Sequence, residues 1–286
     1  MTKRRGNKLG FLIFDFYLSL GIKHAYALLY FVCFYYLLFD RQTVAITSKY
    51  VKKRFKNSGF LSKTWHTYKI IITTGKNLID LRQLERKPES FKFESNYEKI
   101  LDIVAEGKGL IMLTAHMGNW QVMMRELPNL NADMNIVMRP EENPAVSEFL
   151  KIDHGDPYNI NLINPTNGME AILEIMQELA KGNIISIMGD RTIRDEQTIN
   201  MKFFENEIFL PKGPFLIASS AKAPIVQLLT NRTGPCSYAL EISYLSIDDS
   251  IKNKEERLHS LGEQYVKTIE DFLERNPYEW NATSMN

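Results

Sequence analysis

The residue best placed to carry out acid–base chemistry is His116, in the stretch "LTAHMGNWQVMMREL" (113–127). The pattern predicts that a short apolar strand ends just before this histidine and that an amphipathic helix begins just after it. Because an imidazole titrates near neutral pH, a histidine at this junction could remove a proton from a substrate. A histidine that merely caps the helix is the structural alternative.

Two further side chains are expected at the same place in the fold. The apolar segment 183–188 leads to Asp190, and the segment 134–138 leads to Arg139. Open α/β sheets bind ligands at the carboxyl ends of their parallel strands, so both residues should lie near His116. Each could be an ordinary salt-bridge residue, but a base, a carboxylate and a cation that converge resemble an active site.

The elements that must position these residues alternate along the chain. Strands are expected at 110–115, 134–138, 183–188, 223–230 and 238–245. Helices are expected at 62–86 (one or two), 96–109, 118–127, 166–182 and 254–274. This alternation predicts an α/β fold with a mainly parallel sheet flanked by helices. We expect residues 1–65 to form a membrane-attachment segment and residues 66–286 to form the catalytic domain.

The front of the chain is basic and apolar. Residues 1–63 hold twelve Lys and Arg against Asp15 and Asp40, a charge of +10, while the rest of the chain carries −9. The uncharged run 25–39 would form a helix of roughly 22 Å, shorter than the ~30 Å hydrocarbon core of a bilayer. An interfacial or re-entrant helical hairpin on anionic head groups is therefore favoured over a tilted span or a soluble core helix. Nucleic-acid binding is disfavoured, because apolar runs separate the charges.

Several common kinds of site are not indicated. The dinucleotide and P-loop glycine patterns and the Gly-x-Ser-x-Gly elbow are absent from the sequence. The five histidines show no metal-ligand spacing, and Cys33 and Cys236 give no disulfide framework. We expect no metal and no cofactor. No cleaved signal peptide is indicated either, so the catalytic body is expected in the cytoplasm.

Five motifs, in order, carry a family resemblance. "AHMGNWQ" (115–121) resembles the His-x-Gly-Asn-Trp-Glu motif of the bacterial lipid A biosynthesis acyltransferases, the late lauroyl/myristoyl transferases. "MRPEENP" (138–144) is similar to that family's Tyr-Arg-Pro-x-x-Asn-Pro, and "SIMGDR" (186–191) to its strand that ends in Asp. The segment 203–226 and "NPYEW" (276–280) resemble its Phe-Phe-Gly…Ala-Pro-Val and terminal Asn-Pro-x-x-Trp patterns.

The resemblance implies an activity and a set of residue roles. Family members move a fatty acyl group from a thioester to a lipid hydroxyl, so an acyl carrier protein or acyl-CoA donor and a membrane lipid acceptor, such as a lipid A precursor, are expected. The hydroxyl or amine would be acylated at the cytoplasmic face of the bacterial inner membrane. His116 becomes the general base, and Arg139 would bind a phosphate. The remaining candidates for substrate binding are Gly118, Asn119 and Trp120, which also shape the turn, and Arg191.

Gln121 departs from the motif, because the family has an acid at this position. A glutamine can accept a hydrogen bond from His116, but it cannot stabilise the imidazolium by charge. Another carboxylate could substitute, with Asp190 as the first candidate and Glu141 as the second. Alternatively, the enzyme is slower or uses a more easily deprotonated acceptor, or catalysis is lost and the chain is a silent lipid-binding relative.

The acyl chain would need an apolar site. Candidates are the methionines of 117–124 and four aromatic residues, Phe203, Phe204, Phe209 and Phe215. Ordinary core packing is the alternative for each of them.

Overall fold

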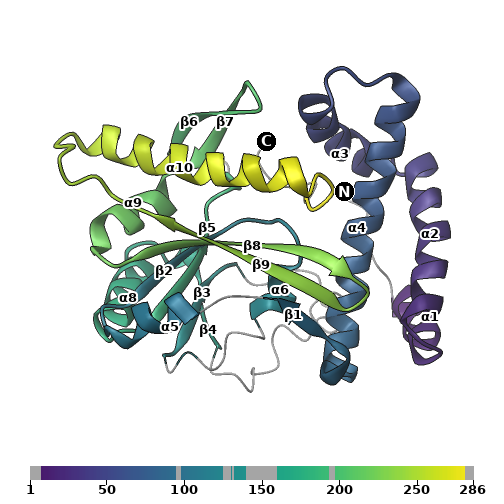
Figure 1. Ribbon diagram of the computed structural model, residues 1–286, viewed down its shortest axis with the longest axis horizontal. Coiled ribbons are helices and arrows are strands. Elements are labelled where there is room, and N and C mark those ends of the chain that lie inside the picture. Colours follow the sequence, from purple (N-terminus) through teal and green to yellow (C-terminus); the bar gives the residue numbers. More distant parts are fainter. Residues whose placement is uncertain are drawn as a thin grey trace.

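The computed structural model describes residues 8–94, 98–124, 130, 132–139, 160–192 and 197–280. Within these residues, seven strands form one sheet in the order β1-β9-β8-β2-β5-β3-β4, and β6 and β7 form a separate hairpin (Figure 1). The strands are β1 (Lys92–Glu94), β2 (Leu110–Thr114), β3 (Met134–Val137), β4 (Ile160–Ile163), β5 (Ile184–Met188), β6 (Thr198–Phe203), β7 (Asn206–Pro211), β8 (Ile225–Gly234) and β9 (Ser237–Leu245).

The helices of the described residues surround this sheet. They are α1 (Lys8–Ser19), α2 (Ile22–Phe39), α3 (Arg41–Arg54), α4 (Phe60–Arg86), α5 (Glu98–Ala105), α6 (Trp120–Met124), α8 (Met169–Ala180), α9 (Lys212–Ala221) and α10 (Lys254–Arg275), with short 3₁₀ turns η1 (Pro88–Ser90) and η2 (Pro165–Asn167). Strands β8, β2, β5, β3 and β4 are mutually parallel. β9 is antiparallel to β8, and β1 is parallel to β9. The predicted α/β fold with a mainly parallel sheet is confirmed.

The central strand β2 is buried on both faces of the sheet. Ile111 and Leu113 pack in the apolar layer formed with α8, α9 and α10. Leu110 and Met112 point to the opposite layer, which includes side chains of α4 and α5. Burial on both faces explains the continuous apolar run, because a strand covered by helices on each side has no polar face. The same covering makes the end of β2 a rigid platform for the residues that follow it.

The helix pair α1 and α2 packs on the outer side of α4, at the right in Figure 1. Ala25, Leu29 and Cys33 lie one helical turn apart on α2 and are buried against α4. A Cβ added at Gly75 of α4 would lie 2.6 Å from Leu29 Cδ1, so the glycine permits the close approach. The two helices are therefore fixed to the body of the protein along the length of α2.

Asp15 interrupts the apolar run of α1 for a structural reason. Its two carboxylate oxygens accept hydrogen bonds from Arg82 Nε and Nη2 of α4, both at 3.0 Å. Such a two-point pair fixes geometry as well as charge. The lone acidic residue of α1 thus ties this helix to α4.

The hairpin β6–β7, helix α9 and the edge strands β1 and β4 were not predicted. The β6–β7 turn places Phe204 and Glu205 at φ of 45° and 62°. Glycine and asparagine usually occupy such positions, so the sequence carries no hairpin signal there. The expected helix 62–86 forms as the single helix α4. The end of the expected helix 118–127 and the candidate Glu141 lie outside the described residues.

Candidate active site

His116 and Asp190 meet at the carboxyl ends of the two central strands. His116 follows β2 and Asp190 follows β5, and these strands pair in parallel with Thr114 opposite Met188. His116 Nδ1 lies 2.9 Å from Asp190 Oδ1, and the backbone N–H of His116 donates to Asp190 Oδ2 at 3.1 Å. The proximity predicted from the two strand ends is confirmed, while the catalytic roles of both residues remain predictions.

In this His116–Asp190 pair, called the dyad below, the carboxylate is buried and the imidazole is partly accessible to solvent. Asp190 is fully buried, whereas 21% of the His116 side chain is exposed. Tyr265 of α10 lies beneath and donates its hydroxyl proton to the carbonyl of Thr114 at 2.8 Å. Burial, and next the charge of Asp190, raise the pKa of Tyr265 well above its ordinary value. Tyr265 therefore stays protonated and holds the end of β2 by a hydrogen bond.

The turn after His116 is clamped by the carboxyl-terminal segment. Gly118 has a φ of +59°, and its N–H donates to the carbonyl of Glu279 at 2.8 Å. Met117 and Trp280 form an isolated antiparallel bridge. A Cβ on Gly118 would lie 1.7 Å from the carbonyl oxygen of Thr230, so only glycine fits. The turn therefore depends on "NPYEW" for its position.

Gly118→Ala is expected to lower the free energy of unfolding by about 2–5 kcal/mol, because the left-handed conformation and the overpacking both cost energy. Gly107→Ala is the matched control, since Gly107 has a φ of +69° and nothing within 4 Å of an added Cβ. The control should lose only about 1–2 kcal/mol. Denaturant unfolding of both variants measures the difference, and equal losses would contradict the contact with Thr230.

A buried polar network holds the other side of the turn. The Asn119 side chain is buried and donates to the Asn77 carbonyl at 2.9 Å and to the Tyr238 hydroxyl at 3.0 Å. Tyr238 and Arg232 both bond to the fully buried Asp80. Although burial opposes the charge of Arg232, Asp80 and the neighbouring tyrosines hold the pKa of the guanidinium above its ordinary value. The network joins α4, β8 and β9 to the turn, and the sequence did not predict it.

The expected substrate-binding residues of this turn make contacts with the protein itself. Asn119 is 3% exposed, and its side-chain amide bonds within the network. Asn77 Nδ2 donates to the Gly118 carbonyl at 2.9 Å. Trp120 is partly buried and packs against the apolar layer that contains side chains of α4 and α5. These contacts agree with the expected role in shaping the turn. Direct contact of the three residues with a substrate remains a prediction.

Arg139 and Arg191 lie at the same carboxyl edge of the sheet. Arg139 is the second residue after β3, Arg191 follows Asp190, and both are exposed. Among the residues that the structure describes, Arg139 has no ion pair or hydrogen bond with His116 or Asp190. The cation is thus at the expected edge, but the dyad forms without it.

Comparison with known protein families matches residues 51–281 to the bacterial lipid A biosynthesis acyltransferases. The match covers most of the chain and includes all five sequence motifs. The chain belongs to this family. It is an acyltransferase of the lipid A biosynthesis type. A comparison with curated proteins finds no match.

In this acyltransferase, Gln121 follows the turn on α6, at the position where the family motif has an acid. Its side chain is partly exposed, and no hydrogen bond between Gln121 and His116 is seen within the described ranges. The ring nitrogen that an acid would engage is instead bonded to Asp190. The described side chain that contacts the Nδ1 atom of His116 is thus Asp190, which follows β5, and not the residue five positions after the histidine.

The aromatic candidates for an acyl-chain site divide into two groups. Phe203 and Phe215 are buried in the core, which is the structural alternative. Phe209 is exposed on β7, and Phe204 is partly buried at the β6–β7 turn.

Both cysteines are buried free thiols. The described residues contain no group of three His, Cys, Asp or Glu that could hold a metal ion.

Proposed function

We propose that this acyltransferase moves a fatty acyl group from a thioester donor to a hydroxyl or amine of a membrane lipid, with His116 as the general base. The observation that carries the proposal is the 2.9 Å contact between His116 Nδ1 and Asp190 Oδ1 at the ligand-binding edge of the sheet. Family membership gives acyl transfer, and the contact supports the identity of the base.

The dyad supports a direct transfer without a covalent enzyme intermediate. With Asp190 accepting a hydrogen bond from the Nδ1–H of His116, the Nε2 lone pair of the same ring can take the proton of the acceptor hydroxyl. The acceptor oxygen then attacks the thioester carbonyl, and a C–O bond forms. The C–S bond breaks as the tetrahedral intermediate collapses, and the imidazolium returns the proton to the departing thiolate. Asp190 stabilises the imidazolium while it carries the proton.

The arrangement supports Asp190 as a substitute for the acid that is missing at Gln121. A carboxylate that is buried and fixed by two hydrogen bonds can supply the charge that an amide lacks. We propose that Asp190 replaces the acid normally found five residues after the histidine. Glu141, the second candidate, lies outside the described residues.

The proposed donor is an acyl carrier protein or coenzyme A thioester, and the proposed acceptor is a phosphorylated glycolipid such as a lipid A precursor. Arg139 and Arg191 support an anionic acceptor, because both guanidinium groups are exposed at the edge where His116 lies. Arginine binds phosphate oxygens through two parallel hydrogen bonds.

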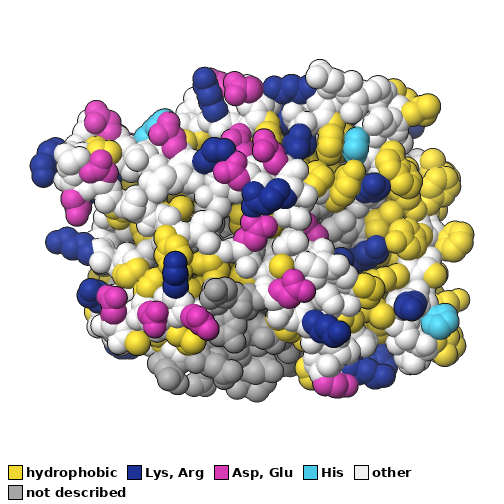
Figure 2. Space-filling model, in the orientation of Figure 1, with side chains coloured by type: hydrophobic (Ala, Val, Ile, Leu, Met, Phe, Trp, Pro, Cys, Tyr) yellow, Lys and Arg dark blue, Asp and Glu magenta, His cyan; other side chains and the backbone are white. Residues whose placement is uncertain are grey.

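Association with the cytoplasmic face of the bacterial inner membrane is part of the proposal. α2 is long and apolar enough to cross a membrane, with a length of about 27 Å. Its outer face and that of α1 form an exposed apolar surface, at the right in Figure 2. The largest contributors are Leu12, Phe16, Phe31, Tyr35, Leu38 and Phe39. Because α2 is also fixed to α4, we propose that this surface lies in the membrane interface. The division at residue 65 remains a proposal, since α4 runs through it.

Reconstitution of the full chain in lipid vesicles tests the function. Release of thiol from an acyl thioester and a new acylated lipid in mass spectra are expected only when a phosphorylated glycolipid is present. Parallel reactions with carrier-protein and coenzyme A thioesters identify the donor, and lipid profiles of a deletion strain identify the acceptor. Thiol release without any lipid acceptor would indicate a thioesterase. Absence of transfer from either donor would favour the silent lipid-binding relative.

A further inference from the structure

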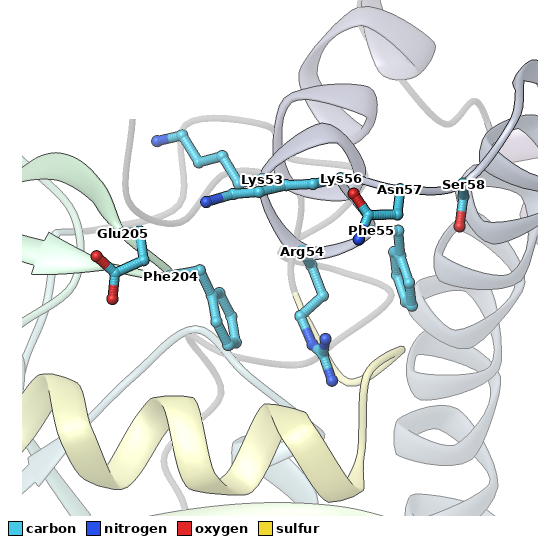
Figure 3. A pocket seen from close by; sticks show the side chains of 8 residues that line it. All are labelled: Lys53, Arg54, Phe55, Lys56, Asn57, Ser58, Phe204 and Glu205. Carbon is cyan, nitrogen blue, oxygen red and sulfur yellow. The ribbon is translucent and has the colours of Figure 1, made fainter.

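A basic cavity that is lined by neither His116 nor Asp190 lies between α3 and the β6–β7 turn (Figure 3). Its volume is about 350 Å³, at the lower end of the ~300–1,000 Å³ that ligand sites occupy. One wall is the end of α3 with the loop that follows, and the other is the β6–β7 turn. The lining residues are Lys53, Arg54, Phe55, Lys56, Asn57, Ser58, Phe204 and Glu205.

Three cations line this cavity against a single carboxylate. In the described part of the chain, Lys53, Arg54 and Lys56 form no ion pair, and Glu205 forms none with them. In Figure 3 the side chains of Lys53 and Lys56 extend from the α3 side towards the β6–β7 turn. Charges that face one another without counter-ions repel, and a bound anion would relieve the repulsion.

Arg54 is the most constrained of the three cations. Its guanidinium lies 5.1 Å from the ring centre of Phe204 and 5.4 Å from that of Phe55, which hold it in place. Its Nε is buried and has no hydrogen-bond partner among the described residues. An unpartnered buried donor is costly unless a ligand or water bonds to it. Packing thus fixes this guanidinium and leaves its Nε without a hydrogen-bond partner among the described residues.

We propose that this cavity binds a phosphate group through Arg54, with Lys53 and Lys56 as additional cations. A planar guanidinium binds phosphate oxygens by paired hydrogen bonds, and lysines add compact positive charges. Burial, and next the neighbouring Lys49, lower the pKa of Lys53, which is the direction expected for a cation that lacks an anionic partner. The assignment does not depend on His116 and adds a site to the proposed acyltransferase.

A lipid head group is the source of phosphate that the surroundings favour. The helix that follows the cavity loop begins with Phe60 and Leu61, which are 83% and 82% exposed. Trp65, one turn further on, is exposed as well. Exposed apolar and aromatic side chains beside lysines are typical of surfaces that lie in the membrane interface. The cavity would then hold the phosphate of an anionic lipid beside the point of insertion.

Binding of inorganic phosphate to the full chain in a neutral detergent tests the site by calorimetry. Wild type should bind saturably, and Arg54→Gln should weaken binding about tenfold or more, because one charge-assisted pair is lost. Lys52→Gln is the matched control, since Lys52 is an exposed cation of the same helix and does not line the cavity. Equal binding by Arg54→Gln and Lys52→Gln, or no saturable binding by wild type, would overturn the proposal.

Two further experiments complete the test. One distinguishes a loss of binding from a loss of folding, and the other identifies the source of the phosphate. Lys56→Gln leaves the packing of Arg54 untouched and should still weaken phosphate binding, so it covers the case in which Arg54→Gln does not fold. Vesicles of equimolar phosphatidylglycerol and phosphatidylcholine should displace inorganic phosphate from wild type, whereas pure phosphatidylcholine vesicles should not. Phosphate binding without displacement by either vesicle supports the site but overturns the lipid source in favour of a soluble phosphate compound.

Discussion

Replacing Asp190 by Asn is expected to lower the rate of acyl transfer by about 10⁴-fold, the size of effect that an amide has beside the histidine of serine proteases. The carboxylate accepts two hydrogen bonds from His116, one from Nδ1 and one from the backbone N–H. An amide has only one acceptor oxygen. If that oxygen faces the backbone, the NH₂ group faces Nδ1 and selects the wrong tautomer. If the oxygen faces Nδ1 instead, the NH₂ group faces the backbone N–H of His116, which is also a donor and loses its acceptor. Steady-state transfer kinetics measure the loss.

Three comparisons make this result specific. Asp190→Asn should still unfold cooperatively, because the two side chains have nearly the same shape, but at a somewhat lower denaturant midpoint, because one buried hydrogen bond is lost. His116→Ala lacks the proposed base, so it should reduce acyl transfer to the background rate and serves as the reference for complete loss. Gln121→Glu should leave the rate almost unchanged, because Asp190 already provides the charge. A near-normal rate in Asp190→Asn, or a large gain in Gln121→Glu, would show that the dyad does not support catalysis.

The proximity of the two residues of the candidate site could be predicted because both follow strongly patterned strands. β2 and β5 are short, continuous apolar runs, and a run covered on both faces has a clear sequence signature. Once two such strands are taken as parallel neighbours, the residues just after them must share an edge. The parallel register of β2 and β5 is sufficient to bring His116 and Asp190 together. The amide at Gln121, where the family has an acid, likewise predicts that a second carboxylate supports the histidine.

The supports of the site could not be predicted, because no local pattern encodes them. Asp80 and Arg232 are 152 positions apart, and each looks like an ordinary surface charge in the sequence. Tyr265 lies on an amphipathic helix, and nothing in the sequence of that helix indicates its hydrogen bond to the carbonyl of Thr114 at the end of β2. The motif "NPYEW" carries part of the family resemblance, yet only the structure shows that the Glu279 carbonyl accepts a hydrogen bond from Gly118. Contacts of this kind depend on the packing of the whole fold.

Asp80→Ala is expected to lower the free energy of unfolding by about 3–5 kcal/mol, because it leaves a buried cation without its partner. The Arg232 side chain is only 11% exposed, and Asp80 is fully buried. Asp80 also accepts hydrogen bonds from Tyr26 and Tyr238, so two hydroxyls lose an acceptor as well. Against a total stability of roughly 5–15 kcal/mol this is a large fraction. Denaturant unfolding measures the loss, and a change below about 1 kcal/mol would contradict a desolvated pair.

The double variant Asp80→Leu/Arg232→Met separates stability from positioning. Apolar side chains that replace a buried ion pair are often neutral or stabilising, so most of the lost stability should return. Acyl transfer by the double variant should nevertheless be slower than that of wild type. Arg232 donates to Asn77 at 2.8 Å and to Tyr238 at 2.6 Å, and these two residues hold Asn119 beside His116. A stable double variant with normal transfer would show that Glu279 and the close fit of Gly118 position the turn without the network.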